Sequence, residues 1–150
     1  LQSLDPVAAV QIARVEGSHA IVLVYPIWFG MPPAIMKGYV DRVLGAGVTP
    51  DAIIDRAGQG VLTGGRLLSI TTSGASDVWL DEEGEIEALR HMFGHYLSTG
   101  FSMKSVEHLH FGRIVEDLYQ GFAYQYLRDV HDRAQVLCAT VAADAANPAR

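Results

Sequence analysis

The chain contains 150 residues, 49% of them hydrophobic, and its formal net charge is -6. This length is enough to bury one core, which predicts a single domain over residues 1–150, and the acidic balance without any Lys- or Arg-rich run argues against nucleic-acid binding. The lone cysteine, Cys138, excludes an internal disulfide framework, and its helical surroundings predict a small core side chain.

The sequence shows no sign of a membrane span or a secretion signal. Its apolar runs stay well short of the roughly 18 residues that a membrane-spanning helix requires, and it does not open with a signal peptide. We therefore expect a cytoplasmic protein that does not insert into membranes.

Helices and strands are predicted to alternate along the chain. Asp5 and Pro6 are typical of a helix start, and this helix is expected to end before Gly17. A short apolar run over residues 20–25 lacks alternation, as is typical of a parallel strand covered on both faces. The series continues with a helix over 33–44, a strand over 66–72, a helix over 83–97, a strand over 103–109 and a helix from about 115 to 143. This order predicts an α/β domain whose parallel sheet has right-handed crossovers.

The join between the first strand and the second helix is rich in aromatic side chains. It holds Trp28 and Phe29 between Pro26 and the pair Pro32 and Pro33. In open α/β sheets the binding crevice lies beyond the carboxyl ends of the strands, so aromatics at this place indicate a site for a flat, apolar ligand. The alternative is that both side chains simply pack under a tight turn.

Two sequence blocks carry a family resemblance. The first reads YPIW at residues 25–28 and MPPAIMKGYVDRV at residues 31–43, and the second reads LSITTSG at residues 68–74. Both resemble the flavodoxin-like NAD(P)H:quinone oxidoreductases, a family of NAD(P)H dehydrogenase (quinone) enzymes with relatives among the FMN-dependent azoreductases. The resemblance extends over roughly residues 5–140 and implies a flavodoxin-like, doubly wound parallel sheet.

The resemblance implies a flavin held between two strand-end loops. FMN is the expected cofactor, and FAD stays open. The implied cofactor-binding residues are Pro26, Ile27, Trp28, Phe29, Thr71, Thr72, Ser73 and Gly74. NAD(P)H would give a hydride to flavin N5, from which it passes to a quinone, azo or nitro compound in a ping-pong cycle. Nicotinamide and acceptor would use one flat slot in turn, with Trp28, Phe29 and Trp79 as its walls.

The resemblance also bears on assembly and on the limits of the domain. It implies a homodimer with the site at the interface, in which residues 47–62 cover the partner's flavin. A flavodoxin-like sheet of order 2-1-3-4-5 needs two strands more than the three predicted here, and the strand over 20–25 would otherwise be a bare edge. We therefore expect the N-terminal strands, with the family's phosphate-binding loop, to lie outside this sequence.

The sequence leaves more than one source of a proton for the reaction open. In the animal-type members of the family a tyrosine and a histidine follow the second loop; here Trp79 takes the place of the tyrosine, and residues 75–87 contain no histidine. Solvent, or His108 and His110 at the end of the last strand, could supply the proton. A histidine near a strand end is, however, more often a surface residue, and His110 is kept only as a candidate for the slot.

One histidine pair has the spacing of a metal site. His91 and His95 could hold zinc, but the stretch between them lacks the glutamate of a metalloprotease helix, so no metal site is predicted.

Three functional classes stay open. The first class is the flavin-dependent oxidoreductase. The second is a regulatory or ancillary subunit that binds flavin or nucleotide, and the third is a one-electron carrier like flavodoxin.

Overall fold

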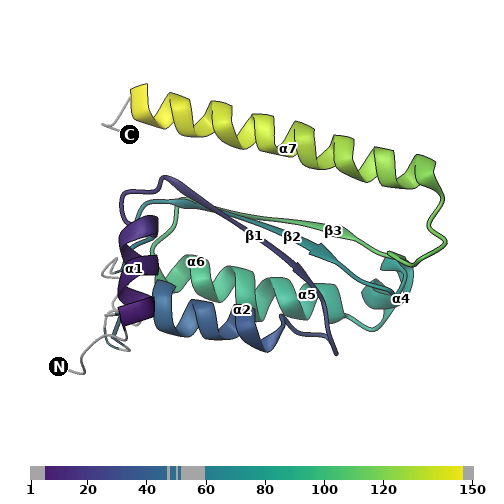
Figure 1. Ribbon diagram of the computed structural model, residues 1–150, viewed down its shortest axis with the longest axis horizontal. Helices are drawn as coiled ribbons and strands as arrows, with labels where there is room; N and C mark the ends of the chain where they lie inside the picture. The colour runs from purple at the N-terminus through teal and green to yellow at the C-terminus, as the bar shows by residue number, and fades with distance from the viewer. Residues whose placement is uncertain (1–5, 47, 50, 52–59, 147–150) are drawn as a thin grey trace.

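The computed structural model describes residues 6–46, 48–49, 51 and 60–146. The described elements follow one another as a helix-and-strand alternation (Figure 1). In chain order they are α1 (Pro6–Val15), β1 (Ala20–Pro26), α2 (Ala34–Tyr39), the π-helix η1 (Val40–Leu44), β2 (Arg66–Thr72), α4 (Asp77–Glu82), α5 (Glu85–Leu89), the π-helix η2 (Arg90–His95), α6 (Tyr96–Gly100), β3 (Ser105–Phe111) and α7 (Gln120–Ala146).

The three described strands form one parallel sheet in the order β1-β2-β3. Their register places Pro26 beside Thr72, and Thr72 beside Phe111, so the three strands end at the same level. Figure 1 shows α1, α2, α5 and α6 on one face of the sheet and α7 along the other. The predicted α/β architecture with a parallel sheet is therefore confirmed.

The core lies on both sides of the sheet. The larger cluster, between the sheet and α1, α2, η1, α5, η2 and α6, contains the buried side chains of Leu23, Leu44, Leu67 and Phe93 among others. The smaller cluster lies under α7 and contains Leu68, Ile70, Phe111 and Leu137. Strand β2 contributes to both clusters because its alternate residues point to opposite faces.

Two predictions about burial are wrong. The strand over 20–25 was expected to be covered on both faces, but Val22 and Val24 are 45% and 65% exposed, because the α7 cluster packs mainly on β2 and β3. Cys138 was expected in the core and is exposed. Its neighbour Leu137 faces the sheet, and adjacent residues on a helix point in different directions.

Several predicted boundaries shift. The helix expected over 83–97 is preceded by α4, which begins at Asp77 after its cap Ser76, and Gly84, with a φ of 72°, separates α4 from α5. The strand expected over 103–109 runs over Ser105–Phe111, and the last helix over Gln120–Ala146. The predicted helix start at Asp5 lies outside the described residues, as do residues 50 and 52–59 between η1 and β2.

Candidate functional site

The three strand-end loops are joined by backbone hydrogen bonds at the carboxyl edge of the sheet. The N–H of Ile27 donates to the carbonyl of Thr72 at 2.7 Å, and the N–H of Ser73 donates to the carbonyl of Phe111 at 3.0 Å. The N–H of Ile114 returns a bond of 2.8 Å to the carbonyl of Ser73. The loops after β1, β2 and β3 are thus held side by side, and the two predicted cofactor loops are brought together.

The loop after β1 is a tight turn with unusual backbone geometry. Trp28 and Met31 exchange two backbone hydrogen bonds of 3.0 and 3.1 Å. The two residues between them, Phe29 and Gly30, have φ values of 52° and 73°. This left-handed region suits glycine but strains a bulky residue such as Phe29. Such strain occurs preferentially at functional sites.

The aromatic side chains around this turn are exposed. The exposed fractions are 62% for Trp28, 103% for Phe29 and 48% for Trp79 at the start of α4. The alternative that Trp28 and Phe29 pack beneath the turn is therefore wrong. Large aromatics held in solvent at the ends of the strands are available to stack on a flat ligand.

The loop after β2 combines buried side chains with unbonded backbone donors. Thr71 is fully buried, and Ser73 is 6% exposed. Within the described part of the chain, the N–H groups of Gly74 and Ala75 have no hydrogen-bond partner. Gly74 is exposed and Ala75 half-buried. Unbonded backbone donors next to exposed aromatics fit a ligand with acceptor atoms along a planar edge.

Glycine is required at the first position of the loop after β3. A Cβ at Gly112 would collide with the Asp77 carboxylate, and would lie 2.7 Å from the Asp77 nitrogen and 2.9 Å from the carbonyl oxygen of Ala75. The next residue, Arg113, has a φ of 55° and donates its N–H to that same carbonyl at 2.8 Å. This close approach holds the loop after β3 against the loop after β2.

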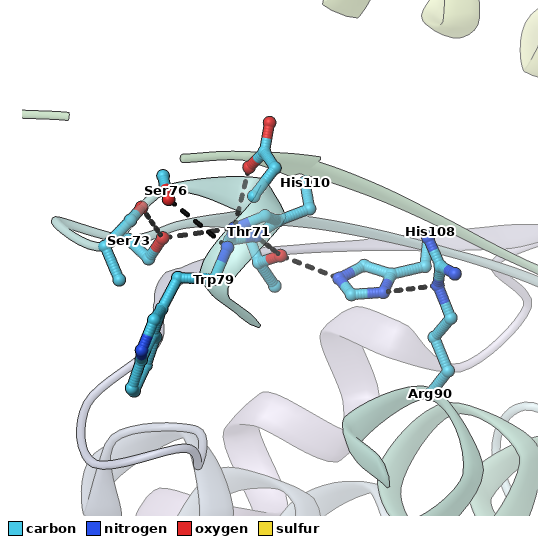
Figure 2. A network of polar contacts seen from close by, with 9 residues as sticks. Thr71, Ser73, Ser76, Trp79, Arg90, His108 and His110 are labelled. Carbon is cyan, nitrogen blue, oxygen red and sulfur yellow. Dashed lines mark hydrogen bonds and ion pairs between the residues drawn. The ribbon is translucent and has the colours of Figure 1, made fainter. Parts of the chain in front are cut away.

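Two histidines of β3 lie beneath these loops. The Thr71 hydroxyl contacts both His108 and His110, and His110 also contacts Ser73 (Figure 2). The His110 side chain is only 6% exposed, so the expectation of a surface histidine is wrong. Burial, with smaller effects of Arg90 and His110, lowers the pKa of His108 to about 4. Burial also lowers the pKa of His110, against the opposing effect of Asp77.

A cavity of about 350 Å³ lies between the middle of the sheet and the α5–η2 helix. Its lining includes Tyr25, Ser69, Arg90, His95 and His108. Burial raises the pKa of Tyr25 to about 12, which keeps its hydroxyl neutral at physiological pH. Within the described residues the Ser69 hydroxyl has no hydrogen-bond partner. The cavity is lined by polar and apolar side chains, the latter including Leu89 and Val106.

The pair His91 and His95 gives no metal site in the described residues. The two rings stack with their centroids 5.5 Å apart. No group of three or more metal-binding side chains occurs in the part of the chain that the structure describes. In the same part, no helix is both long enough and apolar enough to cross a membrane.

A family model described as the flavodoxin-like fold matches residues 2–135. The chain belongs to this family. The arrangement of the parallel strands and of the helices on their two faces agrees with that assignment. In open α/β sheets ligands bind in the crevice beyond the carboxyl ends of the strands, and in this chain the three loops meet there.

Solved structures of related fold include two proteins named for quinone reduction. A candidate quinone reductase from Klebsiella pneumoniae has a TM-score of 0.65 at 23% identity, covering 82% of this chain and 51% of the other. The NAD(P)H:quinone oxidoreductase from Methanothermobacter marburgensis has a TM-score of 0.61 at 18% identity, covering 85% and 60%. At these identities the likeness shows the fold.

A curated relative has higher sequence identity over a shorter stretch. The ribosyldihydronicotinamide dehydrogenase-like protein of Penicillium crustosum is 38% identical over 69 residues, which is 41% of this chain and 26% of the relative. The chain thus spans about a quarter of the length of this relative and about half of the Klebsiella structure.

The network around the two histidines was not predicted from the sequence. Arg90, Ser76 and Gly112 carried no predicted role, and Thr71 was predicted only to bind the cofactor. A signal was present, because Ser69 and Thr71 alternate along β2 and share one face of the sheet, and Ser73 follows at the same spacing in the loop. His108 and His110 alternate in the same way along β3. The predicted roles of the loop residues in cofactor binding stay predictions.

Substituting Gly112 by alanine should destabilise the protein and disturb the loops. The added Cβ meets the backbone of Asp77 and Ala75, and overpacking of this kind costs about 1–3 kcal/mol. Urea unfolding followed by circular dichroism gives the free energy of unfolding. The matched control is Gly38→Ala in α2, where nothing lies within 4 Å of the new Cβ and alanine favours the helix by about 1 kcal/mol. Equal stability of both variants would contradict the close-approach argument.

Acidification should lower the free energy of unfolding. The unfolded chain binds protons on His108 and His110 below their ordinary pKa of about 6.5, whereas the folded protein resists protonation of His108 down to about pH 4. Stability from this source is present above pH 6.5 and is lost as the pH falls towards 4. Urea titrations across this range should show a shallower pH dependence for His108→Gln than for the unsubstituted protein. The exposed His131→Gln on α7 is the control, and an equal slope in both variants would sink the prediction.

Proposed function

We propose that this protein is a flavin-dependent NAD(P)H oxidoreductase that reduces quinones or similar two-electron acceptors, such as azo and nitro compounds. The observation that supports this most is the meeting, at one edge of the sheet, of unbonded N–H groups at Gly74 and Ala75 with exposed aromatics at Trp28 and Phe29. Membership of the flavodoxin-like family, and solved structures named as quinone reductases, favour the same reaction class.

The two strand-end loops fit an isoalloxazine ring. Such a ring has acceptors at N5, O4 and O2 and gains negative charge near N1 on reduction, so it suits backbone donors better than charged side chains. In the proposal Gly74 and Ala75 supply N–H groups, while Pro26, Ile27 and Thr72 lie along the ring edge. FMN is the proposed cofactor, with FAD as the alternative. When bound, the flavin supplies the redox chemistry by taking a hydride from NAD(P)H and giving it to the acceptor.

The exposed aromatics are proposed to form a substrate slot. Trp28, Phe29 and Trp79 would stack on nicotinamide and acceptor in turn, because hydride transfer needs reacting atoms roughly 3 to 3.5 Å apart. Planar side chains restrict planar substrates to parallel orientations and exclude water from the contact. His110 is not proposed as a wall of this slot, since its buried side chain faces Thr71 and Ser73.

A homodimer with the slot at its interface is part of the proposal. The exposed apolar side chains of Trp28, Phe29, Met31 and Ile35 lie in one turn and the helix start that follows it, with exposed fractions from 62% to 103%. Exposed apolar side chains that are grouped in this way mark interaction surfaces. The segment 47–62 that would reach the partner lies mostly outside the described residues. A cytoplasmic location is proposed because the reductant, NAD(P)H, is an intracellular metabolite.

The intact protein should purify yellow or take up one flavin per chain. The donors at Gly74 and Ala75 and the aromatic side chains provide the contacts for the ring. Visible absorbance, followed by chromatography of the cofactor released on denaturation, identifies the flavin and its amount. A colourless protein that takes up neither FMN nor FAD would overturn the flavin proposal.

Steady-state kinetics should show a ping-pong pattern. If NAD(P)H and quinone use one slot in turn, initial-rate plots against both substrates give parallel lines. Intersecting lines would mean that both substrates bind at once. A flavin-loaded protein with no NAD(P)H turnover would instead favour the regulatory subunit or the one-electron carrier.

Removing an aromatic wall should impair the loaded enzyme. Trp28→Ala is expected to lose about tenfold in flavin affinity or in turnover, since an aromatic stacking contact contributes about 0.5–1.5 kcal/mol beyond burial. The control is His91→Ala, an exposed residue on η2 that should leave both values unchanged. An unimpaired Trp28→Ala enzyme would remove Trp28 from the slot.

A further inference from the structure

A row of hydrogen-bonded polar side chains, called the file below, lies beneath the loop of residues 73–76, between β2, β3 and the helix that contains α5 and η2 (Figure 2). Its members are Arg90, His108, Thr71, His110 and Ser73. The Nε of Arg90 lies 3.3 Å from Nδ1 of His108. The Nε2 of His108 lies 2.6 Å from Oγ1 of Thr71. The same Oγ1 lies 2.8 Å from Nδ1 of His110. One hydroxyl therefore links two imidazole rings.

The file continues into the candidate cofactor loop. The Nε2 of His110 lies 3.1 Å from Oγ of Ser73. The Ser73 hydroxyl donates to the carbonyl oxygen of Ala75 at 2.9 Å. Five consecutive contacts thus connect a guanidinium on η2 with a backbone carbonyl next to the unbonded N–H groups.

The first half of the file has only one possible arrangement of hydrogens when both rings are neutral. A guanidinium always donates, so Nδ1 of His108 must accept from Arg90. A neutral His108 then carries its hydrogen on Nε2 and donates it to Thr71. The Thr71 hydroxyl has a single hydrogen, and it must donate that hydrogen to Nδ1 of His110.

The second half follows from the first. Because Nδ1 of His110 accepts, the hydrogen of this ring is on Nε2 and points at Ser73. The Ser73 oxygen accepts it, and its own hydrogen goes to Ala75. Every ring nitrogen and every hydroxyl of the file then has a partner, as buried polar networks require.

We propose that Arg90 sets the polarity of this file, and that Thr71, His108 and His110 are positioning residues that hold the loop of residues 73–75 in its ligand-binding geometry. The role given to that loop rests on the proposed flavin function. The file does not deliver protons, because a guanidinium does not release one and an amide carbonyl does not take one up. Its effect is to fix the Ser73 hydroxyl on Ala75, beside the donors that face the ligand in the proposal.

The charged and titratable groups around the file agree with this polarity. The Asp77 carboxylate lies 3.4 Å from Nε2 of His110, on the side of the ring that faces Ser73. Asp81 also acts on His110. Glu87 lies 3.9 Å from the Arg90 guanidinium, and His95 lines the cavity that Arg90 and His108 share. Asp77 and Glu87 therefore lie beside donors of the file, the Nε2 of His110 and the Arg90 guanidinium.

The test uses two substitutions of Arg90 whose side chains are equally long. In glutamine and glutamate the terminal nitrogen or oxygen is as many bonds from Cα as Nε is in arginine. Arg90→Gln keeps a donor for Nδ1 of His108, whereas Arg90→Glu replaces it with an acceptor. Nitrogen-15 NMR of the imidazole rings, recorded on the apoprotein at mildly alkaline pH, reports which ring nitrogen carries the hydrogen. The exposed His131→Gln variant assigns one further ring and serves as a control.

The expected result is a change that spreads along the whole file. The unsubstituted protein and Arg90→Gln should have both rings protonated at Nε2. In Arg90→Glu both His108 and His110 should switch to Nδ1, although residue 90 contacts only the first of them. A ring protonated at Nδ1 in the unsubstituted protein, or an Arg90→Glu variant in which His110 does not switch, would overturn the proposal.

A second pair of variants tests the effect on the ligand. Thr71→Val removes the linking hydroxyl and Thr71→Ser retains it. Loss of one neutral hydrogen bond, about 1 kcal/mol, corresponds to about a fivefold weaker flavin affinity. This loss is expected for Thr71→Val and Arg90→Glu. The matched variants Thr71→Ser and Arg90→Gln should keep the affinity of the unsubstituted protein. Equal affinities across the four variants would overturn the positioning role. A protein that binds no flavin at all would overturn the proposed function alone, because the NMR result on the apoprotein does not depend on it.

Discussion

The parallel register of the three strands is the constraint on which the candidate site depends. Because Pro26, Thr72 and Phe111 end their strands at one level, the three following loops start side by side and can bond to one another. A shift of one residue would turn every side chain of a strand to the opposite face. It would move Thr71 away from His108 and His110, and would separate the loop donors from the exposed aromatics. The apolar residues of β2 on both faces resist such a shift, so the core on either side of the sheet fixes the geometry of the site.

The side of β2 and β3 that faces α5 and η2 combines an apolar and a polar environment. Towards the amino ends of the strands it is apolar, with Leu67 in the larger core cluster. Towards the carboxyl ends it becomes polar, with Ser69, Thr71 and the two histidines. Burying polar groups is tolerable only where each finds a partner. The file beneath the loop provides partners for Thr71 and the two histidines, whereas the Ser69 hydroxyl lines the cavity without one. The loops above are consequently supported by a directional network, whereas the rest of the sheet is held by non-directional packing.

The sequence was sufficient to predict the alternation of helices and strands, the class of fold and the two loops that meet at the candidate site. Apolar runs bounded by turn residues locate strands well, which is why the strand over 66–72 matches β2. The start of α4 was missed because its first turn depends on a cap by Ser76 and a break at Gly84, which are local features without apolar periodicity. The burial of His110 could not be predicted from its place near a strand end, since it depends on contacts with β2 and on Asp77 from α4. Alternation of polar residues along both strands was the available signal.

The left-handed backbone at Phe29 has a consequence for engineering. Glycine would adopt a φ of 52° without strain, so selection of variants for heat resistance alone would favour Phe29→Gly. The same change would remove the most exposed aromatic side chain of the turn. If Phe29 forms a wall of the proposed slot, stability and ligand stacking make opposite demands on this one residue. A library screened only for thermal tolerance would then accumulate well-folded proteins whose slot has lost that wall.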